Sequence, residues 1–308
     1  MRILVTGGAG FIGSNFIKYF LKKYPQNYIV NVDKLTYAGN LKNLHGVSRT
    51  TRYQFVQADI CDRKRIEPIV KRCDAIIHFA AETHVDRSIK DSEVFIKTNV
   101  LGTQVLLEAA LKYDIKRFVH VSTDEVYGSR KNGYFKETDC LNPSSPYAAS
   151  KAASDLLVLS YWKTYRLPVL ITRSSNNFGP HQYPEKIIPL FVKNLLKGKK
   201  VPLYAKGENI RDWIYVEDNC WAIDLVFQKG KLGEAYNIAA GNYVNNLALT
   251  KKILRVMGKP LSMIEHVADR LGHDFRYAID ATKIKKLGFN SRYSLDQGLA
   301  QTIDWYKK

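Results

Sequence analysis

The sequence predicts an α/β fold: a doubly wound parallel sheet with a smaller C-terminal region interleaved with it. Three observations support this prediction. An apolar, strand-like run at residues 2–6 leads into a glycine-rich turn and then into a helical pattern. Strand-like runs alternate with helical stretches up to about residue 173, as in sheets whose parallel strands are joined by helices. Beyond that point prolines interrupt shorter elements, which indicates a change of architecture.

Six strands are expected in order along the first part of the chain. They are the runs at 2–6, 28–32, 53–56, 75–79, 117–121 and 168–172. Helices are expected directly after the glycine turn, over about 62–72 and 93–112, and from about 147. The helices at 93–112 and 147–166 should each carry an outward apolar face. That face includes Val105, Leu106, Leu156, Leu157 and Leu159.

The change of character near residue 174 sets the expected domain boundary. We place the first domain at residues 1–173 and a second region at 174–308, interleaved with the first. Pro180, Pro184, Pro189 and Pro202 punctuate the second region, where long strand–helix alternation stops.

Composition narrows the classes of protein that this chain can be. Its 308 residues include 45% hydrophobic and 25% charged side chains, the balance of a globular protein. We find no apolar run of membrane-spanning length and no cleavable leader pattern. The net charge of +18 raises the alternative of a nucleic-acid-binding protein. Lys and Arg are spread along the chain, however, so we expect a solvated basic surface and no nucleic-acid or membrane partner.

The four cysteines are Cys61, Cys73, Cys140 and Cys220. They are widely scattered, with neither the spacing of metal ligands nor that of a disulfide framework. We therefore expect no metal, free thiols and a cytoplasmic location.

The glycine-rich turn is typical of a dinucleotide site. Its glycines fit G-x-G-x-x-G from Gly8 to Gly13, and also the wider G-x-x-G-x-x-G from Gly7 to Gly13. Asp33 ends the second strand 20 residues later, where an acidic side chain accepts hydrogen bonds from a ribose diol and repels a 2′-phosphate. The turn predicts an NAD-binding Rossmann domain. Its expected cofactor contacts are Gly7, Gly10, Phe11, Ile12, Gly13, Asp33, Asp59 and Ile60.

Tyr147 and Lys151 are four residues apart on a predicted helix, so both side chains can point at one spot. A tyrosine with a pKa of about 10 is a weak base at neutral pH unless a nearby cation favours the phenolate. Lys151 supplies one such cation, and an oxidised nicotinamide would supply another. Both residues are therefore expected at the cofactor as well as in catalysis.

Thr123, Asp124 and Glu125 follow the fifth strand. In a doubly wound sheet, ligands bind at the carboxyl ends of the strands, so these side chains should face a ligand. Removal of water from a substrate needs one protonated carboxyl and one ionised carboxyl. Adjacent carboxyls in a closed site can differ in this way. The segment therefore indicates a chemical step beyond simple dehydrogenation.

With these motifs placed, the chain resembles the dTDP-glucose 4,6-dehydratases, within the extended short-chain dehydrogenase/reductase superfamily. The resemblance runs over nearly the whole chain. It includes TGGAGFIGSNF at 6–16, DKLTYAGNL at 33–41, HFAAETHVDRSI at 78–89, STDEVYG at 122–128 and PSSPYAASKA at 143–152. It continues with NNFGPHQYPEKIIP at 176–189, RDWIYVEDN at 211–219, YNIAAGN at 236–242 and GHDFRYAIDATKI at 272–284.

The resemblance implies a lyase that converts dTDP-glucose to its 4-keto-6-deoxy product, with NAD regenerated in each turnover. Tyr147 matches the base for the sugar 4-hydroxyl, Lys151 assists it, and Thr123 binds that hydroxyl. Glu125 matches the base that removes the C5 proton, and Asp124 the acid that protonates the departing C6 hydroxyl. The resemblance also implies a homodimer, in which helices 93–112 and 147–166 pair across a two-fold axis.

The resemblance places further residues at the substrate. They are Thr83, Asn176, Glu185, Lys186, Tyr204, Arg211, Asn246, Arg270 and His273. Arg211 and Arg270 suit a diphosphate, because guanidinium groups form charge-assisted bonds to phosphate oxygens. One departure from the family pattern is Leu271, where a proline is usual.

Three alternatives stay open from the sequence. A nucleotide-sugar 4-epimerase would use Tyr147, Lys151 and NAD without the carboxyl pair. A dehydratase acting on another nucleotide sugar would share every motif named above. A catalytically silent NAD-binding or RNA-binding protein would account for the charge but not for the five catalytic residues.

Overall fold

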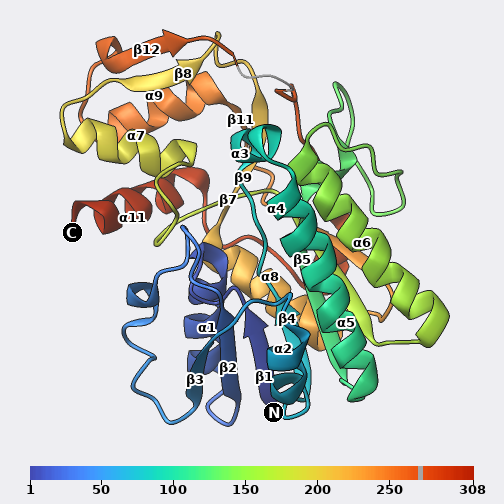
Figure 1. Ribbon diagram of the computed structural model, residues 1–308. Helices are drawn as coiled ribbons and strands as arrows, with labels where there is room; N and C mark the ends of the chain where they lie inside the picture. Colours follow the sequence, from blue (N-terminus) through green and yellow to red (C-terminus); the bar gives the residue numbers. More distant parts are fainter. Residues whose placement is uncertain (270–272) are drawn as a thin grey trace.

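The centre of the protein is a parallel sheet. The computed structural model describes residues 1–269 and 273–308. Within these residues the main sheet has seven strands in the order β10-β6-β5-β4-β1-β2-β3 (Figure 1). Every neighbouring pair is parallel. The strands are β1 (Arg2–Thr6), β2 (Tyr28–Asp33), β3 (Tyr53–Gln57), β4 (Ala75–His78), β5 (Arg117–Thr123), β6 (Val169–Ser174) and β10 (Ala235–Ile238). The predicted doubly wound sheet is confirmed.

Helices cover both faces of this sheet (Figure 1). One face packs against α1 (Phe11–Lys23) and α8 (Val216–Lys229). The other packs against α2 (Arg63–Val70), α5 (Gly102–Lys112) and α6 (Pro146–Tyr165). Successive side chains of a strand point to opposite faces. On β1, Ile3 and Val5 accordingly join the α1–α8 core, whereas Leu4 joins the other one.

Local sequence fixes the start of α6. Ser145 is the N-cap residue, and its side chain accepts a hydrogen bond from the Ala148 N–H at 3.2 Å. Pro146 occupies the first helical position, where a missing N–H costs nothing. Tyr147 therefore lies in the first turn of α6, and Lys151 lies one turn later on the same face.

The helix predicted over 93–112 is present but includes a π-helical stretch. α4 (Glu93–Phe95) passes into η2 (Ile96–Leu101) and then into α5. Asn99 in this stretch accepts from the Glu82 N–H at 2.8 Å and donates to the Glu82 carbonyl at 3.0 Å and to Ser150 at 2.8 Å. Such π-bulges are frequent at functional sites. Here the bulge lets one amide side chain connect the segment after β4 to α6.

The prediction of an outward apolar face on these helices is partly wrong. Val105 and Leu106 are buried against the sheet, because the same apolar pattern that suggested an interface serves the core. Leu157 and Leu159 are half-buried. Leu156 is 59% exposed, and it is joined by other exposed apolar side chains on these helices. They are Val94, Ile96, Leu101, Leu111 and Tyr165.

The chain beyond β6 builds a second unit, which lies toward the top of Figure 1. Its sheets have the orders β11-β9-β7 and β12-β8. The strands are β7 (Asn176–Phe178), β8 (Val201–Tyr204), β9 (Ile210–Tyr215), β11 (Tyr243–Asn245) and β12 (Ile264–Val267). The helices are α7 (Ile187–Leu196), α9 (Asn246–Val256) and α11 (Leu295–Lys307), whereas α10 (Thr282–Lys286) packs against β10 and the core of the main sheet. Short helical segments elsewhere are η1 (Leu41–Leu44), α3 (Val85–Lys90), η3 (Asp124–Tyr127) and η4 (Leu261–Met263).

The two parts of the chain are interleaved. α8 and β10 follow the second unit's first strands in sequence, yet both belong to the main sheet and its covering layer. Phe178, Phe191 and Trp213 lie in a separate core that α7, α9 and α11 share. The exact division at residues 173 and 174 stays a prediction.

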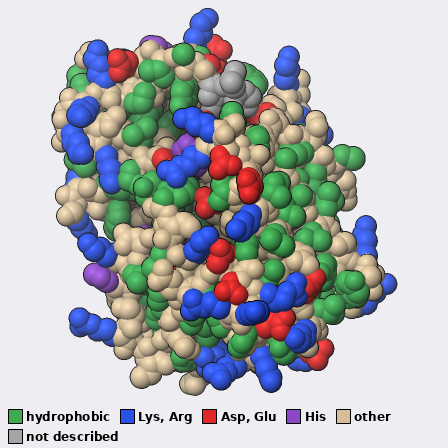
Figure 2. Space-filling view, viewed as in Figure 1, with side chains coloured by type: hydrophobic (Ala, Val, Ile, Leu, Met, Phe, Trp, Pro, Cys, Tyr) green, Lys and Arg blue, Asp and Glu red, His purple; other side chains and the backbone are tan. Residues whose placement is uncertain are grey.

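Basic and acidic side chains are mixed on the face shown in Figure 2, and the thiols are unpaired. Figure 2 shows Lys and Arg side chains dispersed over the viewed face, with acidic side chains between them. All four cysteines are free. Among residues 1–269 and 273–308, no group of three or more His, Cys, Asp and Glu is arranged to hold a metal ion.

One helical stretch of the described chain, Glu93–Lys112, is long and apolar enough to cross a membrane by length and composition alone. Half of its most apolar window is buried inside the protein. Core helices of soluble proteins meet the same criterion, so the stretch is weak evidence for a span.

Candidate active site

The turn between β1 and α1 brings backbone close to backbone. Gly7 has a φ of +70°, and a Cβ there would lie 2.6 Å from the Ala80 nitrogen. A Cβ at Gly13 would lie 2.4 Å from the Gly7 carbonyl oxygen. Only glycine permits these approaches. The N-terminus of α1, capped by Gly10, consequently opens onto a cavity with its free N–H groups, a ready site for a diphosphate.

The structure distinguishes the two glycine spacings. Gly7, Gly10 and Gly13 line the cavity, which favours the wider spacing. A Cβ at Gly8 would instead lie 2.3 Å from the Asn31 side chain and 2.5 Å from Ile17. Gly8 is therefore needed for packing of the turn onto β2 and α1.

Asp33 is held rigidly at the end of β2. One carboxylate oxygen accepts from the Ala9 N–H at 2.9 Å and the other from the Leu35 N–H at 2.8 Å. Burial raises the pKa of Asp33, and these two backbone donors lower it. Each carboxylate oxygen has a second acceptor direction, so Asp33 can still accept from a ligand.

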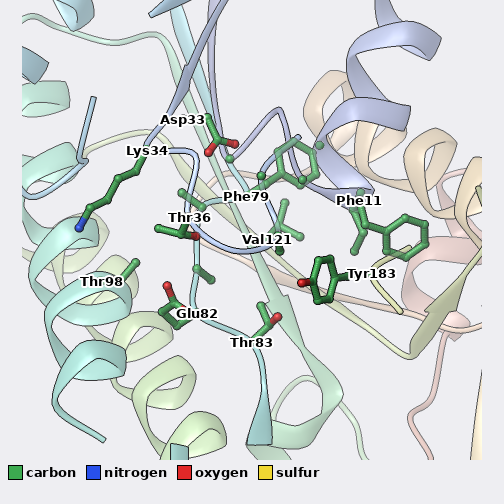
Figure 3. Close-up of a pocket in the computed structure, with 18 of the residues that line it drawn as sticks. Phe11, Asp33, Lys34, Thr36, Phe79, Glu82, Thr83, Thr98, Val121 and Tyr183 are labelled. Atoms are coloured by element: carbon green, nitrogen blue, oxygen red, sulfur yellow. The ribbon is translucent and has the colours of Figure 1, made fainter. Parts of the chain in front are cut away.

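All ten predicted cofactor contacts surround this one cavity. They are Gly7, Gly10, Phe11, Ile12, Gly13, Asp33, Asp59, Ile60, Tyr147 and Lys151. Figure 3 shows the cavity, with Asp33 toward the top and Thr83 toward the bottom. Asp59 forms an ion pair with Lys34 at 2.8 Å. The cavity follows the carboxyl ends of β1, β2, β4 and β5, where a doubly wound sheet binds its ligands.

Lys151 is anchored in the interface between α6 and β5. It is 3% exposed, and Nζ donates to the Val121 carbonyl at 2.9 Å. Nζ also lies 3.3 Å from His120 Nε2, and the same ring nitrogen is 3.5 Å from Asp155. Arg173 binds Asp155 at 2.8 Å. Burial lowers the pKa of Lys151 to about 8, and the Asp155 charge acts in the opposite direction.

Tyr147 faces the same cavity from the first turn of α6. It is 7% exposed, and burial raises its pKa most, with the Glu125 charge adding to that effect. A side-chain hydrogen bond with Thr123 lowers the pKa of the phenol. The protein alone thus favours the neutral phenol, and positive charge is needed to make Tyr147 a base.

Thr123, Asp124 and Glu125 form the end of β5 and the start of η3. The Thr123 hydroxyl accepts from the Glu125 N–H and donates to Asp124, both at 3.3 Å. Asp124 is 3% exposed. Burial raises its pKa well above the usual range, the Glu125 charge raises it further, and Arg211 lowers it. Burial therefore favours the protonated form of Asp124, which lies next to Glu125.

A second cavity adjoins the first and contains Glu125. Of the predicted substrate residues it is lined by Asn176, Glu185, Lys186, Tyr204, Arg211, Asn246 and His273. Glu185 and Lys186 line both cavities, so they mark the junction. Thr83 lines the first cavity instead, and its carbonyl accepts from Lys186 Nζ at 3.1 Å. Arg270 lies outside the described residues.

The Arg211 guanidinium is held in place by contacts within the protein itself. Its guanidinium donates to the carbonyls of Ile210, Asp274 and Phe275 at 2.8–3.2 Å. It also lies over the Tyr277 ring, 4.1 Å from the centroid. Only 5% of Arg211 is exposed. It can therefore direct charge into the second cavity without large movement of its side chain.

A model of the GDP-mannose 4,6 dehydratase family matches residues 4–302. The chain belongs to this family.

Similar proteins within and around the family cover the chain from end to end. The low-salt glycan biosynthesis protein Agl12 of Haloferax volcanii is 52% identical over 99% of this chain and 98% of its own length. The structure of DesIV, a dTDP-glucose 4,6-dehydratase from Streptomyces venezuelae with NAD and TYD bound, has a TM-score of 0.98. It is 50% identical and covers 100% of this chain and 97% of its own. The resemblance inferred from the motifs is confirmed.

Epimerases are more distant. The UDP-glucose 4-epimerase of Thermotoga maritima, solved with UDP-glucose, has a TM-score of 0.93 but is 30% identical, covering 100% of this chain and 99% of its own. The main fold is thus shared, whereas sequence similarity favours the dehydratases of the family.

Sequence reasoning missed several residues that line the two cavities or contact their lining. Tyr277 lines the second cavity, and its hydroxyl donates to Asp274 at 2.7 Å. His84 lies 3.5 Å from Glu185 at the junction. Tyr37 donates to Glu185 at 3.1 Å. All three stand inside segments that carried the resemblance, so inspection of every polar residue in those segments would have found them.

The buried ammonium of Lys151 should destabilise the cofactor-free protein. Below pH 8 the lysine is charged in both the folded and unfolded states, so the full cost of burial is present. Between pH 8 and its unfolded pKa of about 10.4 the folded protein loses the proton first, and the cost fades. We expect Lys151→Met to raise the free energy of unfolding near neutral pH, by roughly 1.4 kcal/mol per unit of pKa difference. The gain should diminish toward pH 10.

Denaturant unfolding at pH 7 and pH 10 measures this difference. Lys199→Met, at an exposed lysine, is the matched control and should change the unfolding free energy little at either pH. A gain from Lys151→Met that is the same at both pH values would contradict the burial argument.

Proposed function

We propose that the protein is an NAD-dependent dTDP-glucose 4,6-dehydratase, a hydro-lyase that forms dTDP-4-keto-6-deoxyglucose. The observation that carries the proposal is the adjacent pair Asp124 and Glu125. The pair lies at the end of β5, beside the Tyr147–Lys151 face of α6 and next to the second cavity. A hydroxyl, an acid, a base and a phenol at one place are the groups that oxidation and water loss require.

The first cavity suits NAD. The N-terminus of α1 suits its diphosphate, and Asp33 suits its ribose diol. Asp59 and Ile60 would lie at the adenine. When bound, NAD accepts a hydride from sugar C4 and returns it to C6, so that the cofactor is regenerated.

Tyr147 acts in the first step by taking the proton of the sugar 4-hydroxyl. Thr123 binds that hydroxyl and aligns it. Lys151 contributes a fixed positive charge one helical turn away, because its Nζ is bonded to the Val121 carbonyl and cannot turn away. Positioned proton transfer of this kind typically contributes about 10²–10⁴-fold to the rate.

The carboxyl pair acts in the second step. A ketone at C4 makes the C5 proton acidic, and Glu125 removes it. Asp124 donates its proton to the C6 hydroxyl, which leaves as water. The burial that raises the pKa of Asp124 keeps that proton available at neutral pH.

The second cavity suits the nucleotide diphosphate. Arg211, Lys186 and His273 bring donors and positive charge to it, and Asn176 and Asn246 bring neutral polar groups. Thymidine as the base rests on the similarity to DesIV. The other substrate residues of the proposal are Thr83, Glu185, Tyr204 and Arg270. The four free thiols fit a reducing cytoplasm.

The second candidate function is nucleotide-sugar 4-epimerisation, which the shared fold would also permit. It needs the tyrosine, the lysine and the cofactor, but no acid and base for water loss. The buried carboxyl of Asp124 beside Glu125 has no step to serve in epimerisation. We therefore favour dehydration.

The geometry at Asp33 predicts a preference for NAD over NADP. A 2′-phosphate would meet the Asp33 carboxylate, whose position the Ala9 and Leu35 N–H groups fix. Titration of cofactor-free protein should give clearly weaker binding of NADP. Asp33→Asn removes the charge and should narrow the difference. Equal affinity of the wild type for both cofactors would refute the assignment of Asp33.

The dehydratase reaction predicts a distinct failure for each variant. Wild type given a panel of nucleotide-glucose substrates should convert dTDP-glucose best, with a product lighter by one water. Glu125→Gln and Asp124→Asn should still oxidise C4, so reduced cofactor accumulates with little deoxy sugar. Tyr147→Phe should block the first step, lowering turnover by about 10²–10⁴-fold with no reduced cofactor.

The absorbance of bound cofactor measures oxidation at C4, and product mass measures the loss of water. A wild-type product of unchanged mass would identify an epimerase instead. Wild-type rates of water loss in both carboxyl variants would make Asp124 and Glu125 structural.

We also propose a homodimer. Leu156, Ile96 and Leu101 are about half exposed on helices whose counterparts in the resembling family pair across a two-fold axis. Sedimentation at micromolar concentration should show a dimer, and Leu156→Glu should shift it toward monomer. Leu261→Glu, at a 60% exposed residue outside these helices, is the control and should stay dimeric. A wild type that sediments only as monomer contradicts the proposal.

A further inference from the structure

At the end of each turnover of the proposed reaction, one proton in the active site lies on a different group from the one that carried it at the start. Tyr147 takes a proton from the 4-hydroxyl, whereas Asp124 gives one to the departing water. Glu125 takes the C5 proton and returns it to C5, and the hydride that leaves C4 arrives at C6. The only net changes in the protein are therefore a Tyr147 that has gained a proton and an Asp124 that has lost one. Before the next turnover, one proton must pass from Tyr147 to Asp124.

The Thr123 hydroxyl lies between these two groups. A hydroxyl has one O–H and two acceptor lone pairs. One lone pair accepts the Glu125 N–H at 3.3 Å, and the O–H donates to Asp124 Oδ1 at 3.3 Å. The remaining lone pair is free for Tyr147, with which Thr123 shares a side-chain hydrogen bond. The backbone donor therefore orients the hydroxyl so that it connects the phenol to the carboxyl.

We propose that Thr123 is the proton relay that resets the active site between turnovers. This inference rests on the proposed dehydratase function. The Tyr147 hydroxyl gives its proton to Thr123 Oγ1 as Thr123 gives its own proton to Asp124 Oδ1. One O–H bond breaks and one forms at the threonine, so the hydroxyl is unchanged. The proton that Thr123 receives lies on the Tyr147 side, so the hydroxyl then donates to the phenolate, and it rotates back toward Asp124 once Asp124 has lost its proton in the next turnover.

Burial makes this internal route better than exchange with solvent. Tyr147 is 7% exposed and Asp124 is 3% exposed. A route through bulk water would need water to reach both groups separately. The relay moves a proton across a single hydroxyl, which already forms hydrogen bonds with both groups. Burial raises the pKa of Asp124 well above the usual range, so its carboxylate takes up a proton more readily than an exposed one would. Burial also favours the neutral phenol of Tyr147, and the positive charges of Lys151 and bound NAD oppose this by favouring the phenolate, which promotes the transfer.

The test compares the first turnover with the steady state. Holoenzyme is mixed with excess dTDP-glucose, and product is measured by rapid quench. Thr123→Val keeps the shape of the side chain but removes the hydroxyl, and Thr123→Ser keeps the hydroxyl. In Thr123→Val the first turnover starts from a reset site. We expect one product per active site, followed by a steady state about 10²-fold slower, which is the lower end of what positioned proton transfer contributes.

Two controls separate the relay from other roles of Thr123. Only Thr123→Val should show a slow phase after the first turnover. Wild type and Thr123→Ser should continue at the rate of their first turnover. In deuterated water the slow phase of Thr123→Val should slow more than its first turnover, because proton movement limits it. If Thr123→Val does not fold, as judged by circular dichroism and bound NAD, Thr123→Ala takes its place.

Two outcomes would overturn the relay. If first turnover and steady state fall by one common factor in Thr123→Val, Thr123 only aligns the 4-hydroxyl. A slow phase without a solvent isotope effect would instead indicate slow product release. If wild type makes no 4-keto-6-deoxy sugar, the proposed function itself is wrong. This result is distinct from both outcomes that contradict only the relay.

Discussion

The contact between β5 and α6 is the constraint on which the site depends. β5 delivers the hydroxyl and the carboxyl pair, and α6 delivers the tyrosine and the lysine. Lys151 reaches across the interface to the Val121 carbonyl, and Asn99 bonds to Ser150 from the π-helical stretch. Neither element can shift without leaving buried polar groups unpaired, which is costly. The reacting groups are therefore preorganised by the core, as positioned proton transfer requires.

Burial then assigns each group its protonation state. The same desolvation raises the pKa of Asp124 and of Tyr147 and lowers that of Lys151, because in each case it opposes the charged form. Asp124 and Glu125 are neighbours in sequence, but only Asp124 is fully buried beneath the strand end. Their proposed division into acid and base follows from this difference in environment, which the sequence alone does not contain.

Features set by local pattern were predictable, and those set by distant contacts were not. The six strands and the glycine turn followed from periodicity and from the special geometry that Gly13 requires. The placement of Thr123, Asp124 and Glu125 at a ligand site followed from the carboxyl edge of the parallel sheet, and their meeting with Tyr147 and Lys151 followed from the resemblance. The π-helical stretch, the burial of Val105 and Leu106, and the Tyr277 ring beneath Arg211 depend on tertiary packing. A residue pattern gives no direct signal for any of these.

The position of β10 limits how this enzyme scaffold can diversify. Ala235 pairs with Ile171, so a strand from the C-terminal half of the chain closes the flank of the main sheet. Without it the longer, fully buried strand β6 would replace β10 as the edge of the sheet, with unpaired backbone groups that invite aggregation. Exchange of the whole second half for an unrelated block would open that edge. New sugar preferences are consequently expected to arise by point substitution and loop change around a retained β10, and not by transfer of a contiguous module.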